Sequence, residues 1–190
     1  CWKPAASRGR VGNSWGLMRE EVLMTIATHA HAYLMRQIDA IVILKREERF
    51  EAALMLTYAG IDHLSWLSNP GEETGSAEFK AWAEKYLDLA SIGCSSNDLW
   101  GARCGLLHTA AAESRDFRSD KAKLVYYTDG AVRVSENADP NVVFVHVTNL
   151  FVSFLQGAVR CVGDCEVDPA KLALIEGKAS RVLAWRPYQH

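Results

Sequence analysis

The sequence predicts a mainly α-helical single domain with one small β-hairpin inserted before the last two helices. Three observations support this fold class. The chain has 190 residues, 49% of them apolar, which suits one domain with a buried core. Apolar residues recur near a period of 3.6 in most segments that lie between helix breakers. One Asp-Gly pair lies between two short runs of residues that favour β-strands.

The first 17 residues contain no signal for a packed element. This segment is polar and does not begin with Met, so residues 1–17 are expected to be a disordered tail or the start of a fragment. The single domain then spans residues 18–190. Apolar periodicity predicts four helices before the hairpin, with a loop at 91–96 before the last of them, over residues 19–44, 47–68, 76–89 and 97–113.

Local signals also predict how the later elements begin. Ser95 or Ser96 can cap the fourth helix, and Asp98 stands three residues after Ser95, where the acid of a capping box lies. The hairpin is predicted from Asp129-Gly130, which favours a type I′ turn. Its arms would be Lys123–Thr128 and Val132–Val134. Val142–Val147 is either a third strand or the beginning of the next helix. The last two helices are expected over residues 150–162 and from Asp168-Pro169 to Trp185.

Composition excludes several classes of protein. The net charge is −2, from 21 basic and 23 acidic residues, so any nucleic-acid contact must come from a local basic cluster. Five cysteines are an odd number in a chain with a sufficient core, which favours reduced thiols and a cytoplasmic location. No apolar run approaches the roughly 18 residues of a membrane-spanning helix. No membrane contact is therefore expected.

Residues 98–109 contain the most informative pattern in the chain. Arg103 and His108 lie within an otherwise small and apolar helix. A five-residue step places them roughly 140° apart around the helix axis, but a long Arg side chain can still reach a phosphate near the histidine. The neighbouring Gly101, Cys104 and Gly105 are small, which permits close approach of another backbone or of a ligand.

The Arg-x4-His spacing on a late helix of an all-helical domain resembles the HEPN domain family. The wider string DLWGARCGLLHTAAAESR is similar to a plasmid- and genome-borne bacterial HEPN subgroup, and the similarity extends from about Arg49 to Trp185. The resemblance implies a helical bundle that forms a homodimer, with the two motif helices lining a shared cleft. It also implies a metal-independent endoribonuclease of a toxin–antitoxin or defence system, with RNA as substrate and an antitoxin or other protein as partner.

By this resemblance, Arg103 would hold the scissile phosphate and His108 would act as general acid or base during attack by the RNA 2′-hydroxyl. Active members usually carry Asn, Asp or His directly after the motif arginine, and this chain has Cys104 there. A thiol is a poor hydrogen-bonding group, which favours the alternative of an inactive HEPN module that binds a protein partner or a nucleotide. A purely structural helical domain is the third interpretation.

Further residues are candidates for supporting roles. The groups expected around the motif pair are Asp98, Cys104, Glu113 and Arg115. A basic cluster can contact an RNA backbone or be an ordinary solvated face, and it consists of Arg115, Arg118, Lys121 and Lys123. Asp62-His63 adds polar groups to the cleft or lies on a solvated face.

No metal or other cofactor is expected. The motif lacks the clustered carboxylates that a magnesium nuclease needs. A zinc site built from Cys104 and His108, with Cys94 nearby in sequence, together with the pair Cys161 and Cys165, is a weaker interpretation than small apolar core residues.

Overall fold

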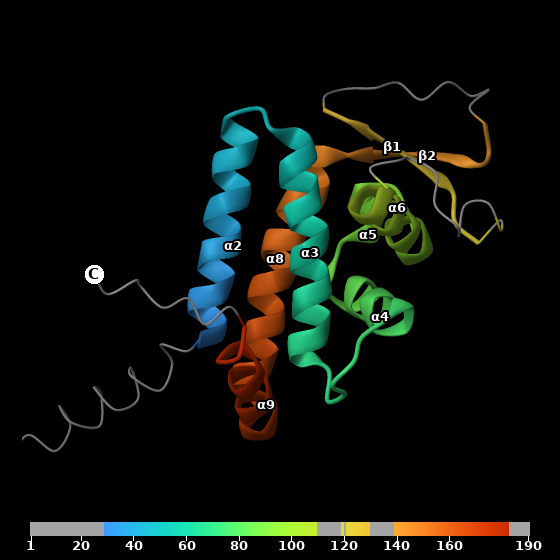
Figure 1. Cartoon of the computed structure of the whole chain (residues 1–190). Helices are drawn as coiled ribbons and strands as arrows, with labels where there is room; N and C mark the ends of the chain where they lie inside the picture. The colour runs from blue at the N-terminus through green and yellow to red at the C-terminus, as the bar shows by residue number, and fades with distance from the viewer. Residues whose placement is uncertain (1–28, 110–118, 120, 130–138, 183–190) are drawn as a thin grey trace, which may run out of the picture.

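The computed structural model describes residues 29–109, 119, 121–129 and 139–182, with the side chains of residues 108 and 109 excepted. It confirms the mainly helical fold (Figure 1). In chain order the elements are α2 (His29–Arg46), α3 (Phe50–Ser68), α4 (Ser76–Tyr86), α5 (Leu89–Ile92), α6 (Ser96–Thr109), β1 (Leu124–Thr128), β2 (Val142–His146), α8 (Val147–Glu166) and α9 (Pro169–Ala179).

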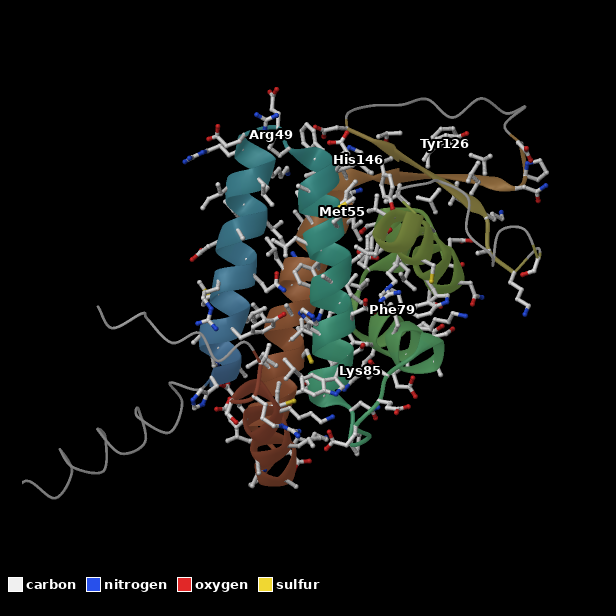
Figure 2. All side chains as sticks on the ribbon, viewed as in Figure 1. Arg49, Met55, Phe79, Lys85, Tyr126 and His146 are labelled. Carbon is white, nitrogen blue, oxygen red and sulfur yellow. The ribbon has the colours of Figure 1, made fainter. Side chains whose placement is uncertain are left out.

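Helix α3 is the centre of the domain, because it packs against α2, α4, α6, α8 and α9. The long helices α2, α3 and α8 run side by side, and α4 and α6 lie on the side of α3 away from α2 (Figure 1). Tyr58 of α3, Phe79 of α4 and Phe154 of α8 are fully buried at these contacts. Figure 2 shows Phe79 where α4 faces α6.

Two glycines allow the helices to approach closely. A Cβ atom at Gly60 of α3 would lie 2.5 Å from the Phe154 ring, and one at Gly157 of α8 would lie 2.6 Å from the carbonyl oxygen of Tyr86. Real Cβ atoms do not make such short contacts. A larger residue at position 60 would need the Phe154 ring to shift, whereas glycine is required at position 157, where the obstacle is backbone.

The sheet that the structure describes is not the predicted pairing. β1 pairs with β2 in parallel, from Leu124 opposite Val142 to Thr128 opposite His146. A parallel pair needs a long crossover, which the connection over residues 129–141 provides. Gly130 and the expected second arm, Val132–Val134, lie outside the described residues. The two interpretations of Val142–Val147 both hold, since β2 runs directly into α8.

Several element boundaries differ from the expected ones. The first helix is described from His29 to Arg46, and residues 19–28 lie outside the description. The second begins at Phe50, because Glu48 adopts a positive φ of 57° in the turn before it. The third ends at Tyr86, and the short α5 occupies part of the expected loop at 91–96. The helix expected over residues 150–162 extends from Val147 to Glu166.

One buried cation, the ammonium group of Lys178, binds carbonyl oxygens at the end of α3. Lys178 of α9 is only 2% exposed, and its Nζ donates hydrogen bonds to the carbonyl oxygens of Trp66, Asn69 and Gly71 at 2.9, 2.6 and 2.6 Å. The Trp66 carbonyl also accepts from the Asn69 N–H at 3.3 Å, so the ammonium group adds a charged donor to this helix-end carbonyl and to two carbonyls of the loop that follows α3. Within the described ranges, no helix is long and apolar enough to cross a membrane.

Candidate functional site

The beginning of the motif helix has the predicted capping box. The Ser95 hydroxyl accepts from the backbone N–H of Asp98 at 3.2 Å, and the Asp98 carboxylate accepts from the backbone N–H of Ser95 at 2.9 Å. The other oxygen of the buried Asp98 accepts from the backbone N–H of Lys123 at 2.7 Å. Asp98, expected near the motif pair, therefore joins the start of α6 to the segment before β1.

Arg103 forms an ion pair with Asp62 of α3. Its Nε and Nη2 atoms lie 2.7 and 2.6 Å from the same carboxylate oxygen, and both side chains are about one-fifth exposed. Burial lowers the pKa of Arg103, but the hydrogen bond and charge of Asp62 outweigh this effect and raise it. The guanidinium also lies 5.1 Å from the centre of the Trp100 ring, which in turn meets Phe79 edge-on at 5.3 Å.

Asp62, Trp100 and Arg103 line a cavity of about 280 Å³ between α3, α6 and the loop that precedes α4. Its wall consists of Asp62, His63, Trp66, Thr74, Gly75, Trp100 and Arg103. A permanently charged planar donor beside the Trp100 ring, in a cavity that Trp66 also lines, is suited to bind an anion with an attached flat group, such as a nucleotide. The structure thus places Asp62-His63 at the cavity of the motif arginine and not on a solvated face.

Two side chains of helix α2, Tyr33 and Gln37, position His63 through hydrogen bonds. The Tyr33 hydroxyl hydrogen-bonds His63 Nδ1, and Gln37 Nε2 donates to the same hydroxyl at 2.7 Å. Burial lowers the pKa of His63 below its usual value, partly opposed by the charge of Asp62. Sequence reasoning missed Tyr33 and Gln37 because they lie in the apolar stripe of their helix. The available signal was a glutamine at a buried position four residues after a tyrosine.

A second, larger groove of about 960 Å³ lies at the beginning of α6 and is lined partly by Asp98, Lys121 and Lys123. Both lysines are exposed. They are predicted RNA-backbone contacts, and the structure places them on this groove and Arg103 on the other cavity.

The remaining predicted residues are located as follows. The backbone of His108 lies in α6, and its side chain is outside the described part. Cys104 is half-buried next to Arg103, whereas Gly101 and Gly105 are buried within the single chain. Three expected residues lie outside the described ranges, namely Glu113, Arg115 and Arg118.

The cysteine pair of α8 is buried at a different place. Cys161 and Cys165 are free thiols, and the Trp82 indole N–H donates to the sulfur of Cys161 at 3.2 Å. The hydrogen bond from Cys165 lowers the pKa of Cys161, against the opposing effect of burial. Among the residues that the structure describes, no group of three or more His, Cys, Asp and Glu side chains could hold a metal ion.

Comparison with protein-family models, with curated proteins and with solved structures finds no match to this chain.

Proposed function

We propose that this protein is a HEPN-type, metal-independent endoribonuclease, acting in the cytoplasm as a toxin or defence effector. The observation that carries the proposal is the position of Arg103, a half-buried guanidinium on the wall of a 280 Å³ cavity with indole rings beside it. A phosphodiester bound there would meet a planar donor fork, and its base would meet an aromatic surface.

The chemistry requires few groups. Attack of the 2′-hydroxyl on phosphorus breaks the bond to the 5′-oxygen, and one proton must leave the nucleophile while another reaches the leaving group. Arg103 stabilises the charge that develops on the phosphate oxygens. His108, five residues further along the same helix, is the proposed acid or base.

The test is cleavage of single-stranded RNA by the purified chain in EDTA. Arg103→Ala should lower the rate by about 10²–10³-fold, which is the usual effect of removing one donor from a charge-stabilising site. Arg103→Lys should not restore it, because lysine lacks the planar fork. Arg46→Ala is the matched control, since the Arg46 side chain is 75% exposed and pairs only with its neighbour Glu47 among the described residues. Full activity in Arg103→Ala, or activity abolished by EDTA and restored by Mg²⁺, would contradict the proposal.

Two observations favour a second candidate, a non-catalytic HEPN module that binds a nucleotide or a protein partner. The Asp62 carboxylate already takes two nitrogen contacts from Arg103. Cys104 replaces the polar residue that is usual after the motif arginine. This candidate predicts that Asp62→Asn strengthens RNA binding, because a competing anion is removed, while no variant cleaves RNA.

We also propose a homodimer through the face of α6 that bears Cys104 and His108, with an antitoxin-type protein as the alternative partner. The buried Gly101 and Gly105 serve packing within the chain, so the contact would use the remaining positions of this face. Sedimentation at micromolar concentration should show twice the chain mass of 21.1 kDa. A monomer alone under these conditions would count against the dimer.

A further inference from the structure

The hydrogen bonds around His63 fix which ring nitrogen carries the proton. Gln37 Nε2 donates to the Tyr33 hydroxyl oxygen at 2.7 Å. The single hydroxyl proton of Tyr33 is then directed at His63 Nδ1, which accepts it. With the Gln37 amide in this orientation, the neutral ring carries its proton on Nε2.

The Nε2 atom is accessible at the cavity. Within the described part of the chain, only Gln37 Oε1 and His146 Nδ1 are buried side-chain nitrogen or oxygen atoms without a hydrogen bond. His63 Nε2 is not one of these, and the hydrogen bonds of the ring in that part all involve Nδ1. Since His63 lines the 280 Å³ cavity beside Arg103, Nε2 is the atom that it offers to a ligand.

Several charged groups lie near His63 and determine the effect of one added proton. Asp62 on the same helix and Arg103 on α6 neutralise each other. Helix α2 contributes the uncharged Tyr33, whose pKa burial raises. The loop before α4 adds the uncharged Thr74 and Gly75, and the Glu78 carboxylate of α4 accepts from the Gly75 N–H at 2.8 Å. The Lys178 ammonium and the Arg181 guanidinium lie 5.0 and 6.0 Å from the centre of the Trp66 ring. Protonation of His63 adds one positive charge to this set.

We propose that the cavity binds a phosphate-type oxyanion, with His63 Nε2 and the Arg103 guanidinium as its donors, and that His63 takes up a proton when the anion binds. This rests on the proposed function, for which the anion is the phosphodiester of RNA. The incoming anion competes with Asp62 for Arg103, and a proton gained at His63 Nδ1 supplies the second positive charge. The Tyr33 hydroxyl then accepts from Nδ1 and turns its own proton to Gln37 Oε1, a buried acceptor that otherwise has no hydrogen bond. Burial keeps the ring neutral until the anion arrives.

The experiment measures binding between about pH 5.5 and about pH 8, using the fluorescence of the cavity tryptophans Trp66 and Trp100. Two probes are used: inorganic phosphate, and a short single-stranded RNA with 2′-O-methyl riboses, which cannot be cleaved. Affinity should fall by up to about tenfold per pH unit as pH rises, because one proton is bound with the anion. Binding of both probes points to a general phosphate site, and binding of RNA alone points to a nucleotide site.

Variants identify the group that takes up the proton. His63→Gln retains a donor but cannot be protonated. Its binding of the RNA probe, whose phosphodiesters keep one negative charge each across this pH range, should therefore be weaker at low pH and independent of pH. His31→Gln is the matched control, since His31 lies on α2 and pairs with Glu166 outside the cavity. Nitrogen-15 NMR of the wild-type ring gives a second readout that needs no variant. Saturation with phosphate should shift the His63 ring signals to those of the protonated form at pH 7.

A pH slope that persists in His63→Gln, unchanged His63 ring signals at saturation, or no binding of either probe would overturn the inference. The proposed function fails separately. A protein that cleaves RNA but keeps its pH slope in His63→Gln refutes only the role of His63. A protein that never cleaves RNA but loses the slope in His63→Gln refutes only the nuclease.

Discussion

Replacing Lys178 by Met should destabilise the domain strongly, because it removes the cation that satisfies the end of α3. Methionine has a similar length and fits the buried site, but it donates no hydrogen bond. Three carbonyl oxygens, at 2.9, 2.6 and 2.6 Å from Nζ, lose their charged donor. Hydrogen bonds to charged groups are worth roughly 1.5–3 kcal/mol each.

The net loss is smaller than the sum of these bonds. Burial of the ammonium group carries a cost of its own, which lowers the pKa of Lys178, and this cost disappears with the charge. Water can also reach part of the exposed turn that contains Gly71. A net destabilisation of about 3 kcal/mol remains, which for a chain of this size is a fall in Tm of roughly 6–12 °C.

The assay is thermal unfolding followed by circular dichroism, with Lys171→Met as the matched control. Lys171 is on the same helix, but its side chain is 57% exposed and pairs with Asp168 at the surface. Such a pair is worth about 0–1 kcal/mol. If Lys178→Met melts within about 1 °C of the Lys171→Met control, the reasoning that α9 closes the end of α3 through this ammonium group is refuted.

Three further predictions concern packing, protonation and the motif. Gly157→Ala should destabilise the domain by about 1–3 kcal/mol in chemical denaturation, because its Cβ would lie 2.6 Å from the Tyr86 carbonyl oxygen. Gly163 has open space around it, so Gly163→Ala should stabilise the domain by up to about 1 kcal/mol. Equal effects of the two substitutions would contradict the close approach at Gly157. The pKa of His63 is lower in the folded protein than the usual 6.5, so the unfolded chain binds the proton more readily as pH falls. The free energy of unfolding should therefore decrease below pH 6.5, and it should decrease less steeply in His63→Gln. Parallel curves of unfolding free energy against pH for the two proteins would exclude this linkage. Under the proposed function, Cys104→Asn supplies the polar group that active HEPN domains carry after the motif arginine, and it should raise RNA cleavage or leave it intact. A loss of cleavage would show that the thiol itself is needed.

The helices were predictable because their signals are local. The capping box of Ser95 and Asp98 forms as the three-residue spacing predicts, and Asp168 caps α9 by accepting from the backbone N–H groups of Ala170 and Lys171. Apolar periodicity placed both ends of α3 and α4, and the beginning of α6, within a few residues. Such contacts join residues up to four positions apart, which a reader of the sequence can inspect directly.

The sheet and the cavity were not predictable in the same way. Asp129-Gly130 is a strong local turn signal, but it does not determine that β1 finds its partner more than a dozen residues later. The ion pair of Asp62 and Arg103 joins positions 41 residues apart, and it depends on how α3 packs against α6. The hydrogen bonds that join Gln37, Tyr33 and His63 depend on how α2 and α3 are rotated relative to each other. These are properties of helix packing, for which a single sequence carries little information.

The two close helix contacts also differ in how substitution at one position constrains another. At Gly60 the obstacle is the ring of Phe154, a side chain that a second substitution can shorten. Among related sequences, positions 60 and 154 are therefore free to change together, with a larger residue at one matched by a smaller residue at the other. At Gly157 the obstacle is the backbone carbonyl of Tyr86, which every residue type at position 86 carries. No substitution there compensates, so position 157 should remain glycine wherever α8 meets α4 at this distance.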